Sequence, residues 1–307
     1  MINIYWPVYK SLEHQFSELM SNIHIDDNQL SVYSLKISEL ILRAAVEIES
    51  ISKDLYSLNQ GTKTSHIKYD EVCIKHLNQL WNLEKKVIIV SSPNCFQTDR
   101  LIYPFIKNEF RTGVQKMTFG WNNAYQNIKH DRANSLKFGN IKYLFDIMAA
   151  LFTLNVYYKG EAFELGTDSK GTAFPVNLGS EIFSVNLHTR GVYDGTGKYN
   201  KQDDLDKSIY VNVMTEKSQK EWDKANEEMQ RKGSELFAKH PKYIKYISEN
   251  NISKYTGSNL MWDVLGADDF RTVIMKAAQT FTGIENKTFY EAILNKNIIF
   301  PIDKNRP

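Results

Sequence analysis

The sequence has few cysteines and no long apolar run. Its two cysteines, Cys73 and Cys95, cannot form a disulfide framework, and we expect both to be reduced, buried thiols. No Cys or His spacing matches a zinc site, so we expect no metal and no cofactor. The longest apolar stretch, near 148–156, is interrupted by Thr153 and Asn155 and is too short to span a bilayer, so we expect no membrane contact.

The sequence also lacks a dominant charge. Its 38 basic residues nearly balance 36 acidic ones, which leaves a formal net charge of +2. So small a charge does not draw the whole molecule to nucleic acid or to an anionic membrane, and any such binding must use a local patch. Residues 1–10 show no basic start followed by an apolar run and a cleavage site. We therefore expect no signal peptide and a cytoplasmic location.

What is present is the composition of a folded globular protein, with 42% hydrophobic and 12% aromatic residues. Apolar residues recur every three or four positions in five segments, which predicts five long antiparallel helices: 9–23, 29–58, 70–84, 121–130 and 136–157. Glycines after Lys159 mark an irregular connector. We predict a mainly α protein, with a helical bundle over 1–159 and a smaller α+β region over 160–307.

Strands are expected outside these helices. Residues 86–91 are β-branched and fit either a short strand or a helix end, and helical character returns towards Phe110 and Val114. Residues 182–187 are predicted to pair with 209–214 as a β-hairpin whose tip is 193–206. Helices are then predicted over four segments: 216–240, 242–249, 260–265 and 268–281.

Minor polar residues in the C-terminal half have simple interpretations. His188, at a strand end beside Arg190, is predicted to lie on the surface. The group Asp203, Asp204 and Asp206 lacks the Gly and terminal Glu of an EF-hand loop, so a solvated turn is favoured over a cation site.

A polar cluster lies between two of the predicted helices and is the main candidate for a functional centre: Asn123, Asn127, Lys129, His130, Asp131 and Arg132. Helical spacing puts Asn123, Asn127 and His130 on one face, opposite Trp121 and Tyr125, with Arg132 continuing that second side. The imidazole has an ordinary pKa near neutrality and suits proton transfer, while Lys129 and Arg132 suit phosphate binding. The same residues also fit a solvated helix end, and the pattern leaves both interpretations open.

Glu47 is the charged residue nearest the apolar stripe of the 29–58 helix, with Arg43 one turn earlier. A salt bridge between Arg43 and Glu47 is the simpler interpretation. The other is that Glu47 orients a group on a facing helix.

The motif Trp121-x-x-Ala124-Tyr125-x-Asn127-x-Lys129-His130-Asp131-Arg132, followed by an Ala149-Ala150-Leu151-Phe152 helix, resembles a bacterial branch of the HEPN superfamily. The segment from Arg43 through Glu47 to Lys53 resembles the same group's Glu-bearing helix. The resemblance covers about residues 30–158, half of the chain. It implies a helical bundle that forms a homodimer and acts without metal as a ribonuclease, in a toxin–antitoxin or antiphage defence system.

The resemblance also implies roles for individual residues. His130, Arg132 and Arg43 are the implied catalytic groups, with RNA as substrate and an antitoxin or defence-system protein as partner. Three further residues are implied to bind substrate and two to support the site: Asn123, Asn127 and Lys129, and then Glu47 and Asp131.

The chain departs from the ribonuclease pattern at one position. Ribonuclease members place an arginine before the catalytic histidine with four to six residues between the two, and Asn123, Ala124 or Tyr125 stands at that position before His130. The alternative function is an inactive HEPN-like scaffold or sensor that binds a partner protein or a nucleotide. In that case Asn127, His130 and Glu47 would form a buried polar network that sets helix register.

Overall fold

The computed structural model describes residues 3–62, 66–92, 95–96, 100–189 and 201–297. The chain divides into two compact units. Unit 1 contains Met1–Phe163, Lys170–Asn212 and Ala292–Pro307, and unit 2 contains Glu164–Ser169 and Val213–Glu291. Helices predominate, so the prediction of a mainly α protein with a smaller α+β C-terminal region is confirmed.

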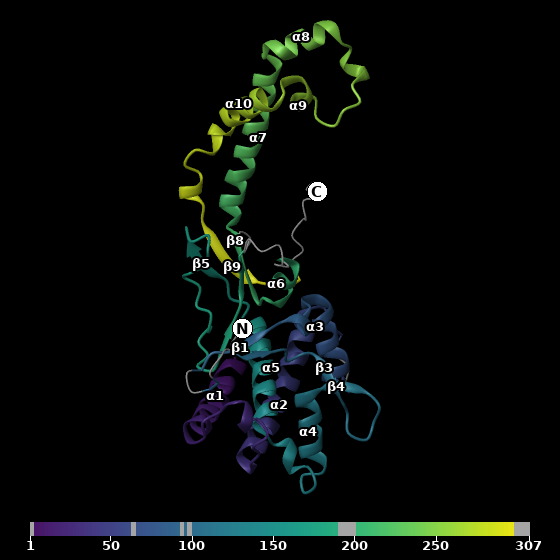
Figure 1. Cartoon of the computed structure of the whole chain (residues 1–307). Coiled ribbons are helices and arrows are strands. Elements are labelled where there is room, and N and C mark those ends of the chain that lie inside the picture. Colours follow the sequence, from purple (N-terminus) through teal and green to yellow (C-terminus); the bar gives the residue numbers. More distant parts are fainter. Residues whose placement is uncertain (1–2, 63–65, 93–94, 97–99, 190–200, 298–307) are drawn as a thin grey trace. The chain divides into compact units, whose positions relative to one another are not determined.

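Unit 1 is built on a bundle of helices, which Figure 1 shows side by side. The α-helices of this bundle lie where the apolar periodicity predicts them: α1 (Tyr5–Asn22), α2 (Leu35–Leu58), α3 (Ile74–Trp81), α4 (Gly120–His130) and α5 (Ile141–Lys159). The third is shorter than predicted, because a π-type turn at Tyr69–Cys73 precedes it and the chain turns at Asn82 with a positive φ of 55°.

Shorter helical turns connect the elements of both units. They are 3-10 in type and occupy six places: Asp27–Gln29, Leu83–Lys85, Leu136–Phe138, Ile252–Lys254, Ala278–Phe281 and Glu285–Lys287. Asp26 caps the first of them by accepting a hydrogen bond from the backbone N–H of Asn28. The helix predicted from residue 29 begins only at Leu35, after its own cap Ser34.

α2 and α5 form the centre of the bundle. Each begins at a side-chain cap, Ser34 for α2 and Asn140 for α5, which satisfies a backbone N–H of the first turn. α2 buries one stripe, whereas α5 is buried on nearly all sides between Ile141 and Tyr157. A helix that is apolar all round can be stable in water only when other elements cover it, and α5 therefore lies inside unit 1.

α1 runs antiparallel to both central helices. The Tyr5 hydroxyl donates to Asp54 near the end of α2 (2.6 Å), while Gln15 accepts from Lys36 near its start (2.9 Å). Ring contacts give the same direction against α5: Tyr5 with Tyr158, and Phe16 with Phe145. The starts of α2 and α5 are held together by backbone pairing at Tyr33 and Asn140, so these two helices run in the same direction.

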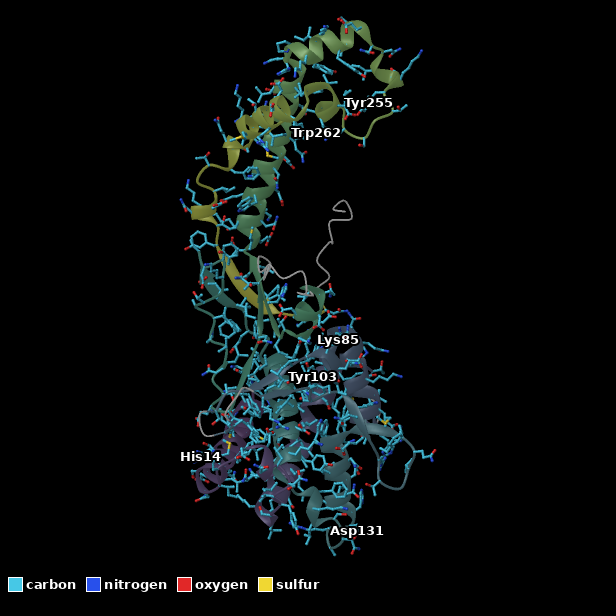
Figure 2. All side chains as sticks on the ribbon, viewed as in Figure 1. His14, Lys85, Tyr103, Asp131, Tyr255 and Trp262 are labelled. Carbon is cyan, nitrogen blue, oxygen red and sulfur yellow. The ribbon has the colours of Figure 1, made fainter. Side chains whose placement is uncertain are left out.

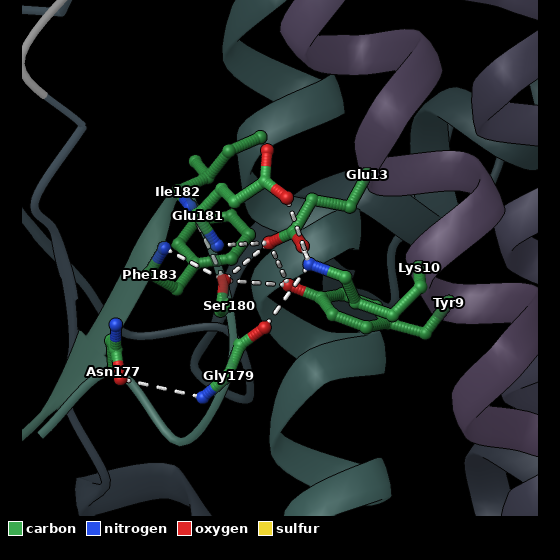
Figure 3. A network of polar contacts seen from close by, with 9 residues as sticks. All are labelled: Tyr9, Lys10, Glu13, Asn177, Gly179, Ser180, Glu181, Ile182 and Phe183. Atoms are coloured by element: carbon green, nitrogen blue, oxygen red, sulfur yellow. Dashed lines mark hydrogen bonds and ion pairs between the residues drawn. The ribbon is translucent and has the colours of Figure 1, made fainter. Parts of the chain in front are cut away.

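A buried carboxylate fixes α1 to a distant segment of unit 1 (Figure 3). Glu13 is fully buried, and its Oε1 accepts hydrogen bonds from the Tyr9 hydroxyl (2.7 Å), the Ser180 hydroxyl and the backbone N–H of Glu181 (3.1 Å). Its Oε2 accepts from Lys10 Nζ (2.5 Å). Every side of the buried charge is thus matched by a donor, as a charge out of water requires. Burial and the neighbouring carboxylate raise the pKa of Tyr9 well above its ordinary value.

Short strands separate α3 from α4. β1 (Ile88–Val90) lies between β2 (Arg100–Ile102) and β6 (Phe183–Val185) in an antiparallel sheet, which settles the open stretch at 86–91 as a strand. The helical character predicted towards Phe110 and Val114 is wrong. β3 (Lys107–Phe110) and β4 (Met117–Phe119) form an antiparallel hairpin there, and its turn contains Gly113 at φ 78°, a conformation that favours glycine.

The β-hairpin predicted between 182–187 and 209–214 is wrong. Most of the first segment is β6, which pairs with β1, and only its last residue belongs to the strand beside 210–214. β7 (Leu187–Thr189) runs parallel to β8 (Tyr210–Met214), with Leu187 opposite Tyr210. Residues 201–206 of the predicted tip belong to helix α6 (Lys201–Lys207), and the rest of the tip lies outside the described residues. Parallel strands require such a crossover. The sheet order is β5 (Phe163–Gly166), β9 (Tyr290–Leu294), β8 and β7.

The side chains of α6 are bound by neighbours in unit 1. His188 is buried, not on the surface, and its Nδ1 lies 2.5 Å from Asp204 Oδ2. Asp203 binds Lys207 at 2.5 Å, and Asp206 binds Lys85 at 2.7 Å. Within the described residues, no three carboxylate, His or Cys side chains form a group that could hold a metal ion.

Lys86, which follows the turn at Leu83–Lys85, is fully buried against the C-terminal end of α6. Its Nζ donates to the backbone carbonyl oxygens of Asp206 and Ser208, each at 3.0 Å. These carbonyls have no partner within a helix that ends at Lys207, so the lysine caps α6. Burial lowers the pKa of Lys86 to about 7.

Unit 2 contains the remaining helices, close to their predicted positions: α7 (Glu216–Ala238), α8 (Pro241–Glu249), α9 (Leu260–Leu265) and α10 (Ala267–Ala277). Pro241 is the first residue of α8, where its missing N–H costs nothing. Phe237, Leu265 and Val273 form a small core. A helix as charged as α7 gains most of its stability from such packing on one face.

Two sequence-based expectations concern single features. Cys73 and Cys95 are free and buried, which confirms them as thiols packed inside the fold, and burial raises the pKa of Cys95 to about 11. Among the helices of the described chain, none has both the length and the apolar character that crossing a membrane requires.

Candidate functional site

The basic residues of the predicted cluster lie at the C-terminal end of α4. Lys129, His130, Asp131 and Arg132 are all exposed, and Figure 2 shows Asp131 at the tip of the bundle. The Asp131 backbone N–H closes the helix on the carbonyl of Asn127 at 2.9 Å. Lys129 Nζ lies 5.3 Å from the centre of the Tyr125 ring. The end of α4 thus presents two cations and one imidazole to solvent.

The two asparagines of the cluster are directed elsewhere. Asn127 Nδ2 donates to Thr112 Oγ1 (2.9 Å) and to Asn123 Oδ1 (3.1 Å). Asn123 Oδ1 also accepts from the Thr112 backbone N–H at 3.1 Å. Both amides therefore bind the β3–β4 turn. The structure does not join them to His130, although all three share a helical face in the sequence.

Asn123 leads to a carboxylate that the sequence did not single out. Glu109 on β3 accepts hydrogen bonds from Lys142 Nζ (3.0 Å), the Tyr143 hydroxyl (3.1 Å to each oxygen) and, more weakly, Asn123 Nδ2 (3.4 Å). A Cβ at Gly120 would lie 2.9 Å from Glu109 Oε1, so the absent side chain makes room for the carboxylate. We call Glu109, Asn123, Lys142 and Tyr143 the Glu109 cluster.

A second carboxyl, Asp146, stands one helical turn after Lys142 on α5. It is half-buried, and burial raises its pKa to about 6, against the opposing effect of the positive charges of Lys142 and Arg100. The negative charge of Glu109 raises the pKa further. Burial and Glu109 also raise the pKa of Tyr143. The Asp146 carboxyl, beside the Glu109 cluster, therefore changes its protonation close to neutral pH.

Arg43 and Glu47 do not join the end of α4 within one chain. The Arg43 guanidinium binds Gln15 Oε1 on α1 at 3.2 Å. Glu47 is half-buried, and burial raises its pKa, with Arg43 opposing the shift. Among the described side chains, no ion pair forms between these two, and neither forms a hydrogen bond or ion pair with His130. A catalytic pair of Arg43 and His130 would need a second copy of the chain.

Sequence reasoning missed Glu109, Thr112, Lys142 and Tyr143. The first two belong to the β3–β4 hairpin, in a stretch predicted to be helical, so their approach to α4 could not be anticipated. A signal for the other two is present. Asn140 is a residue type that caps helices, and a cap at this position puts Lys142 and Tyr143 in the first turn of α5.

Comparison of the chain with protein-family models, with curated proteins and with solved structures gives no match. The resemblance to the HEPN superfamily stays a prediction that rests on the motif in α4. The site is defined by geometry: an exposed basic helix end, and a polar network that begins two turns earlier in the same helix.

Proposed function

We propose that the chain is a HEPN-like bacterial protein that binds RNA at the end of α4, as an effector of a toxin–antitoxin or antiphage defence system. The observation that supports this is that the basic residues of the predicted 123–132 cluster lie apart from its two asparagines. Lys129, His130 and Arg132 are exposed, while the amides of Asn123 and Asn127 are bound to the β3–β4 turn. The basic residues can thus reach a polynucleotide without disturbing the network that holds the helix.

The side chains, rather than the helix end, would bind the phosphodiester. The C-terminus of a helix carries partial negative charge, which repels phosphate. Lys129 supplies a compact positive charge, and Arg132 supplies a planar group that can bind two phosphate oxygens at once. His130 stands between them in the sequence. Binding would therefore weaken steeply with salt, as phosphate contacts do.

Cleavage is the stronger form of the same proposal. The ribose 2′-oxygen would attack the adjacent phosphorus, form a cyclic phosphate and release the 5′-oxygen of the next nucleotide, with His130 moving a proton. The negative charge that develops on the phosphorane oxygens needs an arginine beside the histidine. Arg43 lies with Gln15 in the same chain. In a homodimer, Arg43 or Arg132 of the second copy would complete the pair.

The second candidate is a scaffold or sensor without catalysis. Asn123 and Asn127 tie the β3–β4 turn to α4, and Glu109 ties the same hairpin to α5. A satisfied polar network of this kind sets the register of the elements it joins. In this candidate the exposed end of α4 binds a partner protein, and RNA is not its ligand.

One experiment separates the candidates. Purified protein is incubated with transfer RNA and with mixed cellular RNA in EDTA, and both cleavage and salt-dependent binding are measured for wild type, His130→Ala and the double variant Lys129→Ala/Arg132→Ala. Lys224→Ala on α7 is the matched control, because it removes an exposed lysine from unit 2.

Each outcome favours one candidate. Cleavage that His130→Ala abolishes while binding persists supports the ribonuclease. Binding without cleavage supports an RNA-binding effector, and the double variant should then lower the salt slope by about 0.7 for each single-strand phosphate that the variant no longer neutralises. If wild type neither binds nor cleaves RNA, the RNA proposal fails and the scaffold remains.

A further inference from the structure

One stretch of unit 2, residues 239–262, differs from the rest of the chain in its charge. It contains four lysines, no arginine and a single acidic residue, Glu249. The stretch forms α8, the turn at Ile252–Lys254 and the start of α9, and Figure 1 shows α8 beyond the end of α7. The whole chain carries a formal charge of only +2, so this stretch is a local positive patch.

α8 is attached to the core of unit 2 by one side. The Tyr243 ring packs against the Phe237 ring, with their centres 4.2 Å apart, and Lys242 Nζ donates to the last carbonyl of α9 at 2.9 Å. Successive residues of a helix turn by about 100°, so Ile244 and Ile247 follow on the side that leads away from these two contacts.

The outward side of α8 is an uncovered apolar strip. Ile244 is 52% exposed and Ile247 is 43% exposed, and no residue of α8 is buried. Ile252, in the turn that follows, and Trp262, on the neighbouring α9, are 41% and 46% exposed. A single exposed isoleucine is ordinary, but two that stand three positions apart on a helix form one continuous surface. The described part of the chain does not cover it.

Three lysines of the same stretch carry available charge. Lys239 and Lys254 form no ion pair with a described side chain, and both are exposed. Lys245 is 75% exposed and lies 4.0 Å from Glu249, the outer limit for an ion pair. Unlike Lys242, these lysines are not used inside unit 2. An apolar strip and three hydrated cations thus occur together on α8 and the segments next to it.

The combination of isoleucine and lysine favours a lipid surface over a protein or a polynucleotide. Protein interfaces are depleted in lysine and enriched in arginine, whereas this stretch has four lysines and no arginine. A polynucleotide would pair with the lysines and leave the isoleucines in water. At a bilayer surface, lysine stems lie along apolar groups while the ammonium reaches the headgroups, and tyrosine and tryptophan are common there.

We propose that α8 and the turn after it bind the surface of an anionic phospholipid bilayer. α8 lies in the plane of the surface, with Ile244 and Ile247 at the boundary between headgroups and acyl chains, while Lys239, Lys245 and Lys254 contact lipid phosphates.

Such binding differs from the membrane contact that the sequence argues against. The expectation of no membrane contact came from the lack of a spanning run and of a large net charge, and surface binding through a local patch needs neither. All the residues involved belong to unit 2, so the inference does not rest on the proposed RNA binding.

The test is co-sedimentation of the full chain with large unilamellar vesicles. One set contains phosphatidylcholine alone, and in the other phosphatidylserine makes up about a third of the lipid. We expect binding to the anionic vesicles to be at least about tenfold tighter, because only they attract the lysines. Added salt should weaken this binding, since it screens charges at a surface.

The lysines are tested by reversing their charges. The triple variant Lys239→Glu/Lys245→Glu/Lys254→Glu should weaken binding to anionic vesicles by at least about 100-fold, because each lysine near such a surface contributes about fivefold. A matched triple variant makes the same change on exposed lysines of α7 and α10 and should weaken binding by less than about tenfold. Its substitutions are Lys217→Glu, Lys224→Glu and Lys276→Glu.

The apolar strip is tested separately. Ile244→Ser/Ile247→Ser should weaken binding to anionic vesicles by at least about tenfold, because it removes the apolar area that leaves water. Met275→Ser/Phe289→Ser changes two other exposed apolar residues of unit 2 and should keep the affinity of the wild type. All these side chains are exposed, so the thermal midpoints, measured by circular dichroism, should stay close to that of the wild type.

Three results would overturn the proposal: absence of binding to anionic vesicles at millimolar lipid, equal binding to both kinds of vesicle, or equal weakening by a variant and its matched control. Two other occupants of the patch would also reject it. If vesicles do not bind and Ile244→Ser/Ile247→Ser dissociates a wild-type dimer in sedimentation, the strip joins two copies of the chain. If vesicles do not bind and the lysine variant loses transfer RNA, the patch is a nucleic-acid site.

Discussion

Glu13 and Glu109 are two carboxylates of unit 1 that bind similar donors in different surroundings. Each accepts hydrogen bonds from a tyrosine hydroxyl and from the lysine next to it in sequence: Tyr9 and Lys10 for Glu13, and Tyr143 and Lys142 for Glu109. The Glu13 side chain is fully buried, whereas that of Glu109 is 21% exposed.

The difference lies in the donors that complete each site. Ser180 and a backbone N–H close the remaining side of Glu13, so no position is left for an outside molecule. Beyond its lysine and tyrosine, Glu109 has only the amide contact of Asn123, at the long distance of 3.4 Å, and its side chain stays partly exposed. The identity of the donors therefore does not separate a structural carboxylate from one that can exchange its partners. The closure of the site does.

The largest expected effect comes from removing the closed carboxylate. Glu13→Ala should lower the free energy of unfolding by roughly 3 to 5 kcal/mol, because it leaves the Tyr9 and Ser180 hydroxyls and a backbone N–H without their acceptor. Urea unfolding followed by circular dichroism measures it. Glu18→Ala, on the exposed side of α1, is the control and should change stability by less than about 0.5 kcal/mol. Equal losses in the two variants would refute the role given to Glu13.

The open carboxylate should matter less for folding. Glu109→Ala should cost about 1 to 2 kcal/mol in the same urea experiment, since Lys142 and Tyr143 can turn to water once their partner is gone. Glu39→Ala, an exposed residue on α2, serves as the matched control. A loss as large as that of Glu13→Ala would show that Glu109 is also a closed structural site and would end the comparison.

Much of the helical fold was predictable, because it depends on local patterns. The stripe of α2 repeats without interruption from Ile37 to Leu55, and Pro241 marks the start of α8. The direction of β7 against β8 was not predictable in this way. It depends on whether a helix forms between the strands, and α6 is a seven-residue segment whose acidic composition also suits a turn.

The candidate site was predictable only in part. The motif located α4 and placed Asn123 and Asn127 on one face. Their partners Glu109 and Thr112 come from a hairpin whose position is set by tertiary packing, which no local period reveals. The surface position predicted for His188 is wrong for the same reason, because its partner Asp204 is 16 residues away in the sequence. Contacts between polar side chains far apart in the sequence could therefore not be predicted.

The pH dependence of folding sharpens the comparison at the open site. The pKa of Asp146 is raised from 3.8 to about 6, so its contribution to stability is fully present below pH 3.8 and is lost as the pH rises through 6. Asp146→Asn cannot lose a proton. It should therefore gain stability relative to wild type between pH 4 and 7, by about 1 kcal/mol once solvent screening of a half-buried group is allowed for.

Urea midpoints of wild type and Asp146→Asn at pH 4, 5, 6 and 7 give this difference directly. Asp223→Asn on α7 is the control, because that carboxyl is exposed and should show no such trend. A difference that shrinks towards pH 7 would mean that the ionised carboxylate is stabilised by Lys142 and Arg100, and the open site would then be as well satisfied as the closed one.

The smallest expected effect lies at the end of α4. His130→Ala and Arg132→Ala should each change the free energy of unfolding by less than about 0.5 kcal/mol, because both side chains are exposed. Asn127→Ala, three residues before His130, should cost about 1 kcal/mol, since it removes the hydrogen bonds that its amide donates to Thr112 and Asn123. If His130→Ala proves as costly as Asn127→Ala, His130 belongs to the internal network, and a role in which it meets RNA at the surface becomes untenable.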